Sequence, residues 1–327
     1  MPALILSRIL QAIPVLLVVG FISFSIFTFV GDPISEMLAQ DATSAERAEL
    51  AARLGLDQPF FVQYLRFMGR VLTGEFGLSY RLHRPVTGLI AERLPATLEL
   101  AVTASALSLL VGVPMGVYTG IRPRAGLSRG FMLVSLLGVS LPTFLIGILL
   151  ILLFSVLLGW LPSFGRGEVT MITSWWSTGF LTLSGLKALI LPAVTLSLFP
   201  MTLILRLVRA EMLEVMRTDY IKFARARGLS ERTIHFDHAL KNTLVPVITV
   251  VGLQLGALIA ISLVTETVFQ WPGIGLLFIQ SVTVADIPVM SAYLLLVSTL
   301  FLTINLAVDL LYYAVDPRLR RSTVGMK

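Results

Sequence analysis

Residues that could do chemistry are few in this sequence, and none of them stands in a catalytic pattern. The 327-residue chain contains no cysteine, so it has neither a thiol nucleophile nor a thiolate metal site. None of its lysines follows a glycine, which excludes the GxxxxGK motif that binds nucleotide phosphates. His235 and His238 are three residues apart in a basic stretch, and Gly273 and Gly275 form a GxG without a third glycine. We therefore expect no metal site, no cofactor and no ATP hydrolysis by this chain itself.

The composition is that of a membrane protein. Hydrophobic residues make up 56% of the chain, charged residues only 13%, and the mean hydropathy is +0.88. A soluble domain carries about a quarter charged residues. Here the charged residues are bunched between long apolar runs. This distribution excludes a disordered or collagen-like chain, and we attribute the net charge of +6 to membrane orientation rather than to nucleic-acid binding.

Six uncharged runs are long enough to cross a membrane as helices, since a helix needs about 20 residues to span about 30 Å of hydrocarbon. They are residues 9–30, 100–121, 131–158, 188–205, 244–265 and 289–308. None of them alternates with a period of two, which disfavours a β-barrel. The predicted fold class is an all-α polytopic membrane protein with six transmembrane helices, the first of which is an anchor and not a cleaved signal.

Basic residues predict the orientation, because short loops rich in Lys and Arg stay in the cytoplasm. Arg122, Arg124 and Arg129 lie between spans two and three, and the loop 206–243 is also strongly basic. Both termini are therefore predicted to be cytoplasmic. The chain then divides into a cytoplasmic end with the first span (1–30), an extracytoplasmic helical segment (31–95) and a core of five spans that includes the cytoplasmic loop (96–327).

The extracytoplasmic segment is predicted to be helical. Thr43 and Glu46 have capping-box spacing at the start of one helix, and Gly55 stands where that helix would stop. A second helix is expected to begin at Asp57 with Pro59 in its first turn, and its broad apolar stripe would lie flat. This stripe is either a lid packed on neighbouring spans or a docking surface for an external partner.

Aromatic and charged residues near the ends of the spans have structural interpretations. The tryptophans fit one half of an interfacial aromatic belt. Glu99 and Asp309 lie at the ends of runs, where pairing with Arg93 or Arg318 would explain them. With so few ionisable residues in the spans, a proton- or sodium-coupled carrier is disfavoured. The tryptophans concerned are Trp160, Trp175, Trp176 and Trp271.

Small and polar residues within the spans indicate packing and candidate conduit positions. Glycines recur every four residues in two spans, at 112, 116 and 120 and at 252 and 256, where they let helix backbones approach closely. Several prolines, Pro142 and Pro200 among them, predict kinks. Six polar residues are candidates for lining a conduit, although Ser and Thr also bond to carbonyls of their own helix, and none is assigned to a substrate. These candidates are Ser140, Thr143, Thr195, Gln254, Ser262 and Asn305.

The loop 206–243 is predicted to form a rigid protrusion. Thr218 or Asp219 can cap a short helix over 220–227, and Gly228, just past its end, is expected to have a left-handed backbone. Ser230 can cap a second helix that runs towards residue 242. The surface combines apolar and basic side chains, which suits insertion into a groove of another protein better than contact with anionic lipid headgroups. Those side chains are Tyr220, Phe223, Leu229, Arg225, Arg227, Arg232 and Lys241.

Blocks along nearly the whole sequence resemble the permease subunits of ABC importers for di- and oligopeptides. The most specific block is the loop, where residues 220–230 read YIKFARARGLS and residues 238–242 read HALKN before a proline. The other blocks, in the same order as in that family, are GDP at 31–33, LGLDQP at 54–59, RLPAT at 93–97, SLP at 140–142, ETVF at 266–269, WPGIG at 271–275 and DPR at 316–318. The long segment before the second span resembles the first of the family's two permeases. Where the general importer motif begins Glu-Ala-Ala, this loop has Lys222, Phe223 and Ala224, as is usual in the peptide branch.

The resemblance implies a type I ABC importer permease fold in a bacterial inner membrane, and a non-catalytic subunit that forms half of a translocation path. The implied partners are a second homologous permease, two cytoplasmic ATPases that bind ATP and magnesium, an extracytoplasmic solute-binding protein and membrane lipid, with no nucleic acid. The residues implied to couple the chain to the ATPase are Tyr220, Phe223, Ala224, Arg225, Arg227, Gly228 and Leu229.

The block 271–275 is expected to form a re-entrant outer turn near the binding protein, and an interfacial loop anchored by its tryptophan is the alternative. Its residues of interest are Trp271, Pro272, Gly273 and Gly275. Nickel, glutathione and opine importers share this type of permease, so the cargo stays open among these solutes and peptides. Two other classes also stay open from the residues alone: a secondary carrier and a membrane-bound scaffold. Co-purification with an ATPase separates them from an importer subunit.

Overall fold

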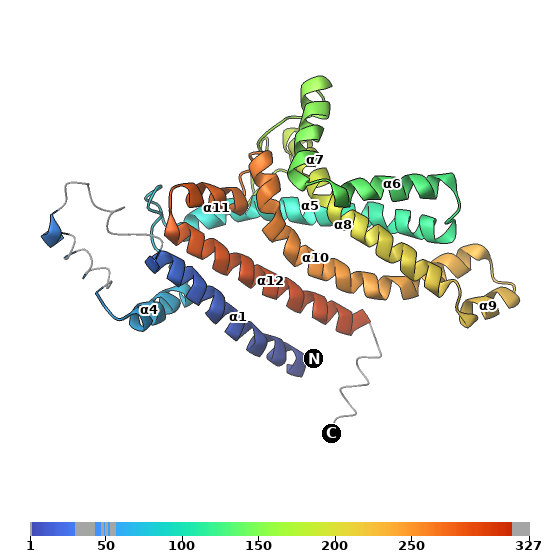
Figure 1. The fold of residues 1–327 in the computed structure, drawn as a ribbon, viewed down its shortest axis with the longest axis horizontal. Helices are drawn as coiled ribbons and strands as arrows, with labels where there is room; N and C mark the ends of the chain where they lie inside the picture. Colours follow the sequence, from blue (N-terminus) through green and yellow to red (C-terminus); the bar gives the residue numbers. More distant parts are fainter. Residues whose placement is uncertain (1, 30–42, 47–48, 50–51, 53–56, 316–327) are drawn as a thin grey trace.

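The computed structural model of the chain describes residues 2–29, 43–46, 49, 52 and 57–315, and helices dominate this part (Figure 1). The long helices are α1 (Pro2–Phe29), α5 (Val86–Ile121), α8 (Leu183–Val215), α10 (Leu240–Val268) and α12 (Ile287–Val315). The shorter elements are α4 (Phe60–Leu72), α6 (Gly126–Ser140), α7 (Thr143–Leu150), the π-helix η1 (Ile151–Leu157), β1 (Thr170–Met171), β2 (Ser177–Thr178), α9 (Asp219–Ala226), the π-helix η2 (Thr233–Ala239) and α11 (Ile274–Thr283).

Five of the described helices, α1, α5, α8, α10 and α12, are long and apolar enough to cross a membrane. A sixth crossing results if α6 and α7 with η1 are counted as one bent pair, whose two halves meet at 112°. The predicted span 131–158 is therefore not one continuous helix. Pro142 lacks an N–H and disfavours helical geometry at the preceding Leu141, and its own ψ of 138° is extended. The proline predicted to kink the helix instead breaks it.

Helices α5 and α8 pack closely together and form the centre of the bundle (Figure 1). The glycine repeat of α5 faces α8: a Cβ atom built on Gly116 would lie 2.6 Å from Cβ of Val208, and one built on Gly120 would lie 2.6 Å from Cβ of Met212. Only glycine fits at this separation. The predicted close approach of helix backbones is confirmed here and also between α10 and α12, where Gly252 lies against Val308.

The remaining long helices form a layer beside this pair, with α10 packed on α8 and α12, and α12 packed on α1 (Figure 1). The molecule is elongated. Helix α9 lies at one end of the long axis, and α11 and α4 lie towards the other. We call these the α9 end and the α11 end. Helix α5 runs without a break through residues 95 and 96, where the sequence division placed a boundary.

Helix α8 is longer than the uncharged run 188–205 that predicted it, because its ends continue into polar residues. Arg206, Arg209 and Glu211 all lie within the helix. These residues have good helix propensity, so the helix continues where the apolar run stops. The membrane-crossing run is therefore only the middle of the element.

Helix α4 packs along α1 through aromatic side chains. The Tyr64 hydroxyl donates a hydrogen bond to the Leu17 carbonyl at 2.9 Å, and the Phe24 ring lies within 6 Å of Phe60 and Tyr64. This contact agrees with the lid interpretation, although Phe61 on the other side of α4 is 71% exposed. The helix begins at Phe60 and not at Asp57, with Pro59 as its N-cap.

The predicted capping box at Thr43 is confirmed. The Thr43 N–H donates to the Glu46 carboxylate at 2.8 Å, and the Glu46 N–H donates to the Thr43 hydroxyl at 3.3 Å. The hydrogen bond from the Thr43 backbone lowers the pKa of Glu46 below its ordinary value. Gly55, Arg318 and the blocks at 31–33 and 316–318 lie outside the described residues.

Candidate functional site

The α9 end carries the predicted helical protrusion. Helix α9 covers 219–226, with Thr218 at its N-cap, but the Thr218 hydroxyl donates to the Val215 carbonyl at 2.6 Å instead of capping α9. Gly228 follows the helix with φ of +77°, and the Leu229 N–H returns to the Ala224 carbonyl at 3.3 Å. The left-handed backbone predicted at Gly228 is confirmed. It turns the chain sharply out of α9.

The second half of the protrusion is joined directly to a span. Ser230 accepts a hydrogen bond from the Thr233 N–H at 3.2 Å, as predicted for a cap. The helix that follows is π-helical over η2 and passes into α10 without a break. The predicted second helix is therefore present, and it continues into span five instead of stopping near residue 242. A displacement of η2 is consequently a displacement of α10 as well.

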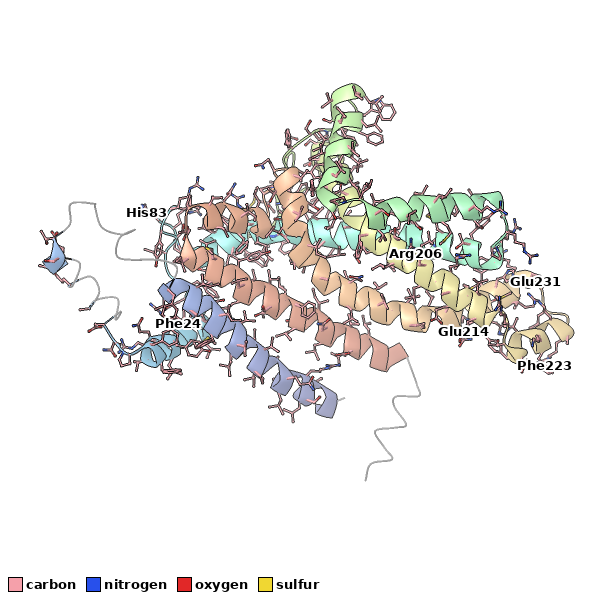
Figure 2. The ribbon with its side chains drawn as sticks, in the orientation of Figure 1. Phe24, His83, Arg206, Glu214, Phe223 and Glu231 are labelled. Atoms are coloured by element: carbon pink, nitrogen blue, oxygen red, sulfur yellow. The ribbon has the colours of Figure 1, made fainter. Side chains whose placement is uncertain are left out.

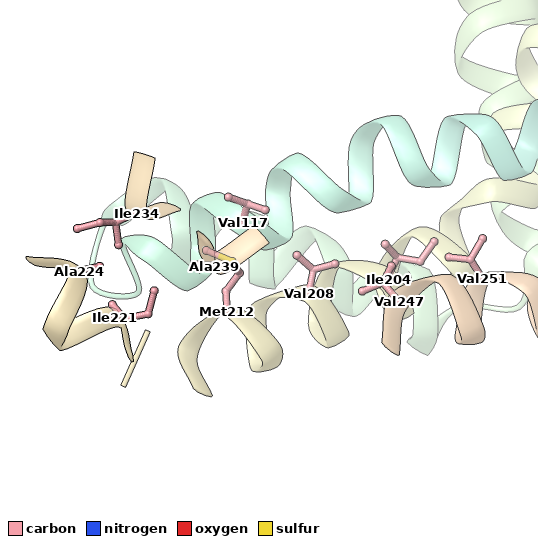
Figure 3. Close-up of a cluster of buried hydrophobic side chains, with 10 residues drawn as sticks. All are labelled: Val117, Ile204, Val208, Met212, Ile221, Ala224, Ile234, Ala239, Val247 and Val251. Atoms are coloured by element: carbon pink, nitrogen blue, oxygen red, sulfur yellow. The ribbon is translucent and has the colours of Figure 1, made fainter. Parts of the chain in front are cut away.

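Buried apolar side chains join the protrusion to the bundle (Figure 3). Ile221 of α9 and Ile234 of η2 are fully buried, and they share one cluster with Met212 of α8 and Val117 of α5. Ala224 is also in this cluster and only 7% exposed, so it faces the bundle and is unavailable to a partner. We call this group, which also contains Ile204, Val208, Ala239, Val247 and Val251, the apolar cluster.

The opposite face of α9 is exposed (Figure 2). The Phe223 side chain is 64% exposed, and the Arg227 guanidinium lies 5.8 Å from the centre of its ring, within the range of a cation–π contact. Tyr220 and Leu229 are about two-fifths exposed. The structure thus brings together six of the seven predicted coupling residues at the surface and places only the alanine inside.

An ion pair and a hydrogen bond connect α9 to the segments that follow it at the surface of the protrusion. Arg225 contacts Glu231 at 3.0 Å and thereby links α9 to the start of the next helix. The hydrogen bond from Arg225 lowers the pKa of Glu231 below its ordinary value of 4.5. The Tyr220 hydroxyl accepts a hydrogen bond from Asn242 at 2.8 Å and so ties α9 to α10. Since the ion pair is exposed, it orients these side chains more than it stabilises the fold.

Near the α11 end, the block at Trp271 forms a buried turn between α10 and α11. The Trp271 side chain is 1% exposed, and its indole N–H donates to the Ala96 carbonyl of α5 at 2.8 Å. Trp271 is therefore not part of an interfacial belt, as the composition had suggested. The other three tryptophans lie in the loop after η1, where Trp160 is 64% exposed.

Glu266, which the sequence did not single out as a site residue, organises this turn. Its fully buried carboxylate accepts hydrogen bonds from the Thr97 hydroxyl at 2.7 Å and from the Leu276 N–H at 2.9 Å. The second bond satisfies a free N–H at the start of α11. Gly273 lies so close that an added Cβ would be 2.4 Å from both side chains, Thr97 and Glu266. The glycine of the WPGIG block is thus needed for close approach.

Two ion pairs differ from those predicted. Glu99 of α5 pairs with Arg166 and not with Arg93, at 2.6 Å, and both side chains are buried. Arg166 also donates to the Ser177 carbonyl at 2.8 Å, which attaches the loop carrying β1 and β2 to α5. Asp309 pairs with Arg8 of α1 at 2.7 Å. Glu99 and Thr97 lie one turn or less apart on α5, so this helix anchors both the loop and the turn.

Four of the six candidate conduit residues fall into two groups, and the other two, Ser140 at the end of α6 and Asn305 of α12, belong to neither. Thr195 and Ser262 are buried and donate hydrogen bonds to carbonyls of their own helices, at Leu191 and Ile259. These two side chains therefore satisfy their own helices, which was the alternative to lining a conduit. Thr143 and Gln254, by contrast, line one cavity. Within the described residues, no group of three or more His, Cys, Asp or Glu side chains could hold a metal ion.

Two family models together match most of the chain. Residues 112–321 match the family described as "Binding-protein-dependent transport system inner membrane component". Residues 1–101 match a second description, "Binding-prot-dependent transport system membrane comp, N-term". Together the two matches leave only short stretches uncovered.

Full-length relatives and a solved structure agree with these matches. A dipeptide transport system permease protein of Alkalihalophilus pseudofirmus is 37% identical over 335 residues, covering 98% of this chain and 100% of the relative. An oligopeptide transport system permease protein of Bacillus subtilis is 38% identical over 321 residues, covering 98% and 99%. An inward-facing structure of the MetNI methionine ABC transporter contains a chain that matches with a TM-score of 0.56 at 21% identity, over 70% of this chain and 96% of that one. At this sequence identity, the structural match is evidence for the fold alone.

Proposed function

Because the chain belongs to the family of inner-membrane components of binding-protein-dependent transport systems, we propose that it is one permease subunit of an ATP-driven importer for di- or oligopeptides. The fold is that of type I ABC importer permeases. Two relatives that cover nearly the whole chain are named for dipeptides and oligopeptides, which favours peptides over nickel, glutathione or opines as the cargo.

In this proposal the chain forms half of the path, and a second homologous permease forms the other half. The α9 end contacts an ATPase in the cytoplasm, and the α11 end receives cargo from a solute-binding protein outside a bacterial inner membrane. Both termini then lie in the cytoplasm. ATP and its magnesium belong to the ATPases, so this chain contributes no catalytic group and changes conformation in response to their closure.

The observation that carries the proposal is that the apolar cluster lies directly beneath the exposed Phe223 side chain. Phe223 projects from α9, while Ile221 on the opposite side of the same helix is fully buried against α8 and α5. Each buried isoleucine contributes about 1.5–3 kcal/mol, and a close-packed interior transmits displacement because it has little free volume. A force on the Phe223 face therefore reaches three spans. A solvated loop would need no such attachment.

We assign the buried turn at 271–275 to an outer gate. Its indole and the Glu266 carboxylate tie α10 and α11 to α5, so the turn moves only with these helices. An interfacial loop would instead keep its tryptophan at the headgroups, and burial of Trp271 argues against that alternative. Pro272 and Gly275 complete the turn, and Gly275 also approaches the Leu263 backbone too closely for a side chain.

Single-cysteine crosslinking tests the coupling contact, because the chain has no native cysteine. Phe223→Cys in the assembled transporter is expected to crosslink to an ATPase subunit with a short thiol-reactive reagent. Phe61→Cys provides a matched control, since Phe61 is similarly exposed but lies on α4, towards the other end. Crosslinking from Phe61 and none from Phe223 would contradict the proposed orientation.

Uptake measurements test the wider function. Proteoliposomes that contain both permeases, the ATPases and the binding protein are expected to accumulate a labelled dipeptide only when ATP is supplied on the ATPase side. Uptake that continues without nucleotide would instead indicate a secondary carrier. Purification of the chain with no ATPase bound would favour a scaffold.

A further inference from the structure

A cavity of about 220 Å³ lies between α7, α8 and α10. Its lining includes Thr143 at the start of α7, Phe199 and Pro200 of α8, and Gln254 and Ile261 of α10. None of these side chains is in the apolar cluster, but two further lining residues, Leu196 and Leu258, belong to the buried cluster that contains Trp271. We call this space the midspan pocket.

The pocket is at mid-depth in the spans. Pro200 is near the centre of α8, which covers 183–215, and Gln254 and Leu258 are near the middle of the apolar span Pro246–Val268. Thr143 follows the break where α6 and α7 meet at 112°. The pocket therefore opens at the level where a solute in transit would be furthest from water on either side.

Its polar groups have no partner in the described chain. No hydrogen bond joins the Gln254 amide or the Thr143 hydroxyl to another described residue. Pro200 has no N–H, so the helix bond to the carbonyl of Leu196, which also lines the pocket, is missing. Both side chains are half-buried, so their polar atoms are accessible from the pocket, and polar side chains within spans mark solute pathways. These groups therefore point to a polar occupant.

The chemistry of the lining limits which solutes the pocket can bind. Apolar side chains form most of the wall, and no charged residue, imidazole or thiol is present. A nickel ion would require such ligands, and the charged termini of a peptide would have to lie outside this uncharged lining. A peptide bond carries one donor and one acceptor, which match the two ends of the glutamine amide. Since a cavity of about 150 Å³ admits benzene, the volume here suffices for one aliphatic side chain.

We propose that the midspan pocket binds the peptide bond and an apolar side chain of a di- or oligopeptide during transit, an inference that rests on the proposed import function. Gln254 and Thr143 hydrogen-bond to the peptide backbone, and the walls at Phe199, Leu258 and Ile261 contact its side chain. Binding is weak because no ion pair contributes, and weak binding is what a transported solute requires in order to leave.

Paired substitutions on the intact transporter provide the first test. Gln254→Leu is expected to lower the rate of dileucine uptake by about 2- to 10-fold, the effect of one neutral hydrogen bond. Gln280→Leu, on α11 and outside the pocket, should leave the rate unchanged. Ile261→Trp fills the pocket and should reduce dileucine uptake more than diglycine uptake. Val264→Trp is its control, because Val264 is similarly exposed on α10 but does not line the pocket.

Thiol protection gives a second readout that does not depend on turnover. Gln254→Cys in this cysteine-free chain should react with a small maleimide in the assembled transporter, and dileucine with the binding protein should slow that reaction. No reaction at all would show that lipid or the second permease fills the pocket. Reaction at the same rate with and without dileucine would show a water-filled space. Both results would overturn the proposal.

The two proposals fail in different ways. A wild-type transporter that imports dileucine, combined with unchanged uptake in Gln254→Leu and Ile261→Trp, would overturn the pocket and leave the import function standing. A wild-type transporter that assembles with its ATPases but imports no peptide would overturn both.

Discussion

The two ends of this bundle are held together by different forces. At the α9 end, the apolar cluster joins α9 and η2 to three spans, and ion pairs such as Arg225 with Glu231 lie at the surface. Towards the α11 end, buried polar groups of α5 make the connections: Glu99 with Arg166, and Thr97 with Glu266. The same helix, α5, takes part in both.

The difference bears on how each end can move. Apolar contacts are non-directional, so α9 can shift slightly while it keeps most of its burial. Buried ion pairs and hydrogen bonds have fixed geometry, and losing one partner leaves a buried charge or polar group unsatisfied. The apolar contacts at the α9 end therefore persist when α9 and the spans beneath it shift together, whereas each polar contact near the α11 end is either intact or broken.

The largest effect is expected from breaking the buried ion pair. Glu99→Leu leaves the Arg166 guanidinium buried without its carboxylate, and we expect a loss of about 3–5 kcal/mol in the free energy of unfolding. Thermal unfolding of the purified transporter measures this loss. The double variant Glu99→Leu with Arg166→Met should recover much of it, because no unpaired charge remains. Additive losses in the double variant would show that the two side chains are not coupled.

A graded effect is expected in the apolar cluster. Ile221→Ala should lower the free energy of unfolding by about 2–5 kcal/mol, and Ile221→Val should lower it by about 0.5–1.5 kcal/mol, because the alanine removes more buried volume. Trypsin cleavage at Lys222 and Arg225 of α9 should accelerate in the same order. Equal effects of the two substitutions would mean that shape, and not buried volume, holds α9 in place.

A smaller effect is expected at the turn after α9. Gly228→Val places a branched side chain at φ of +77° and should cost about 1–2 kcal/mol, although nothing in the structure crowds the new atoms. Gly228→Asn is the control, because asparagine accepts this conformation. Peptide-stimulated ATP hydrolysis by the assembled transporter should fall for valine and be retained for asparagine. Equal activity of the two variants would argue against a role for the turn geometry.

The smallest effect concerns acid pH. The pKa of Glu231 is lowered by Arg225, so this pair contributes stability above the ordinary value of 4.5 and loses it as pH falls through the lower folded-state pKa. Proteolysis of the loop by an acid-active protease should therefore increase slightly as pH falls below 4.5. Arg225→Gln removes the main cause of the lowered pKa, so most of that increase should disappear in the variant. An equal increase in the variant would show that the pair is too exposed to matter.

Features set by neighbouring residues were predictable from the sequence. The capping box at Thr43, the left-handed Gly228 and the cap at Ser230 all involve residues within one helical turn. The apolar runs marked the five long apolar helices of the described residues and the bent pair of α6 and α7, because length and hydropathy need no knowledge of partners. The residues proposed for coupling followed from a resemblance to a family, and the structure places all but Ala224 at the surface.

Pairings across the fold were not predictable in this way. Glu99 and Arg166 are 67 residues apart, Thr97 and Glu266 are 169 apart, and Trp271 reaches an α5 carbonyl 175 residues away. The tryptophan was expected at the membrane surface because composition reports residue type and not burial. Likewise, Pro142 predicted a kink, but the packing of α7 against α8 and α10 set its angle of 112°.

The sequence by itself indicated that this chain crosses a membrane repeatedly and presents a capped helical loop on one side. Those properties depend on hydropathy, residue type and local hydrogen bonds. Only the tertiary structure decided which buried charges pair, which face of α9 is exposed and that Thr143 and Gln254 line one cavity. These outcomes depend on distances between segments far apart in the chain, which packing alone sets.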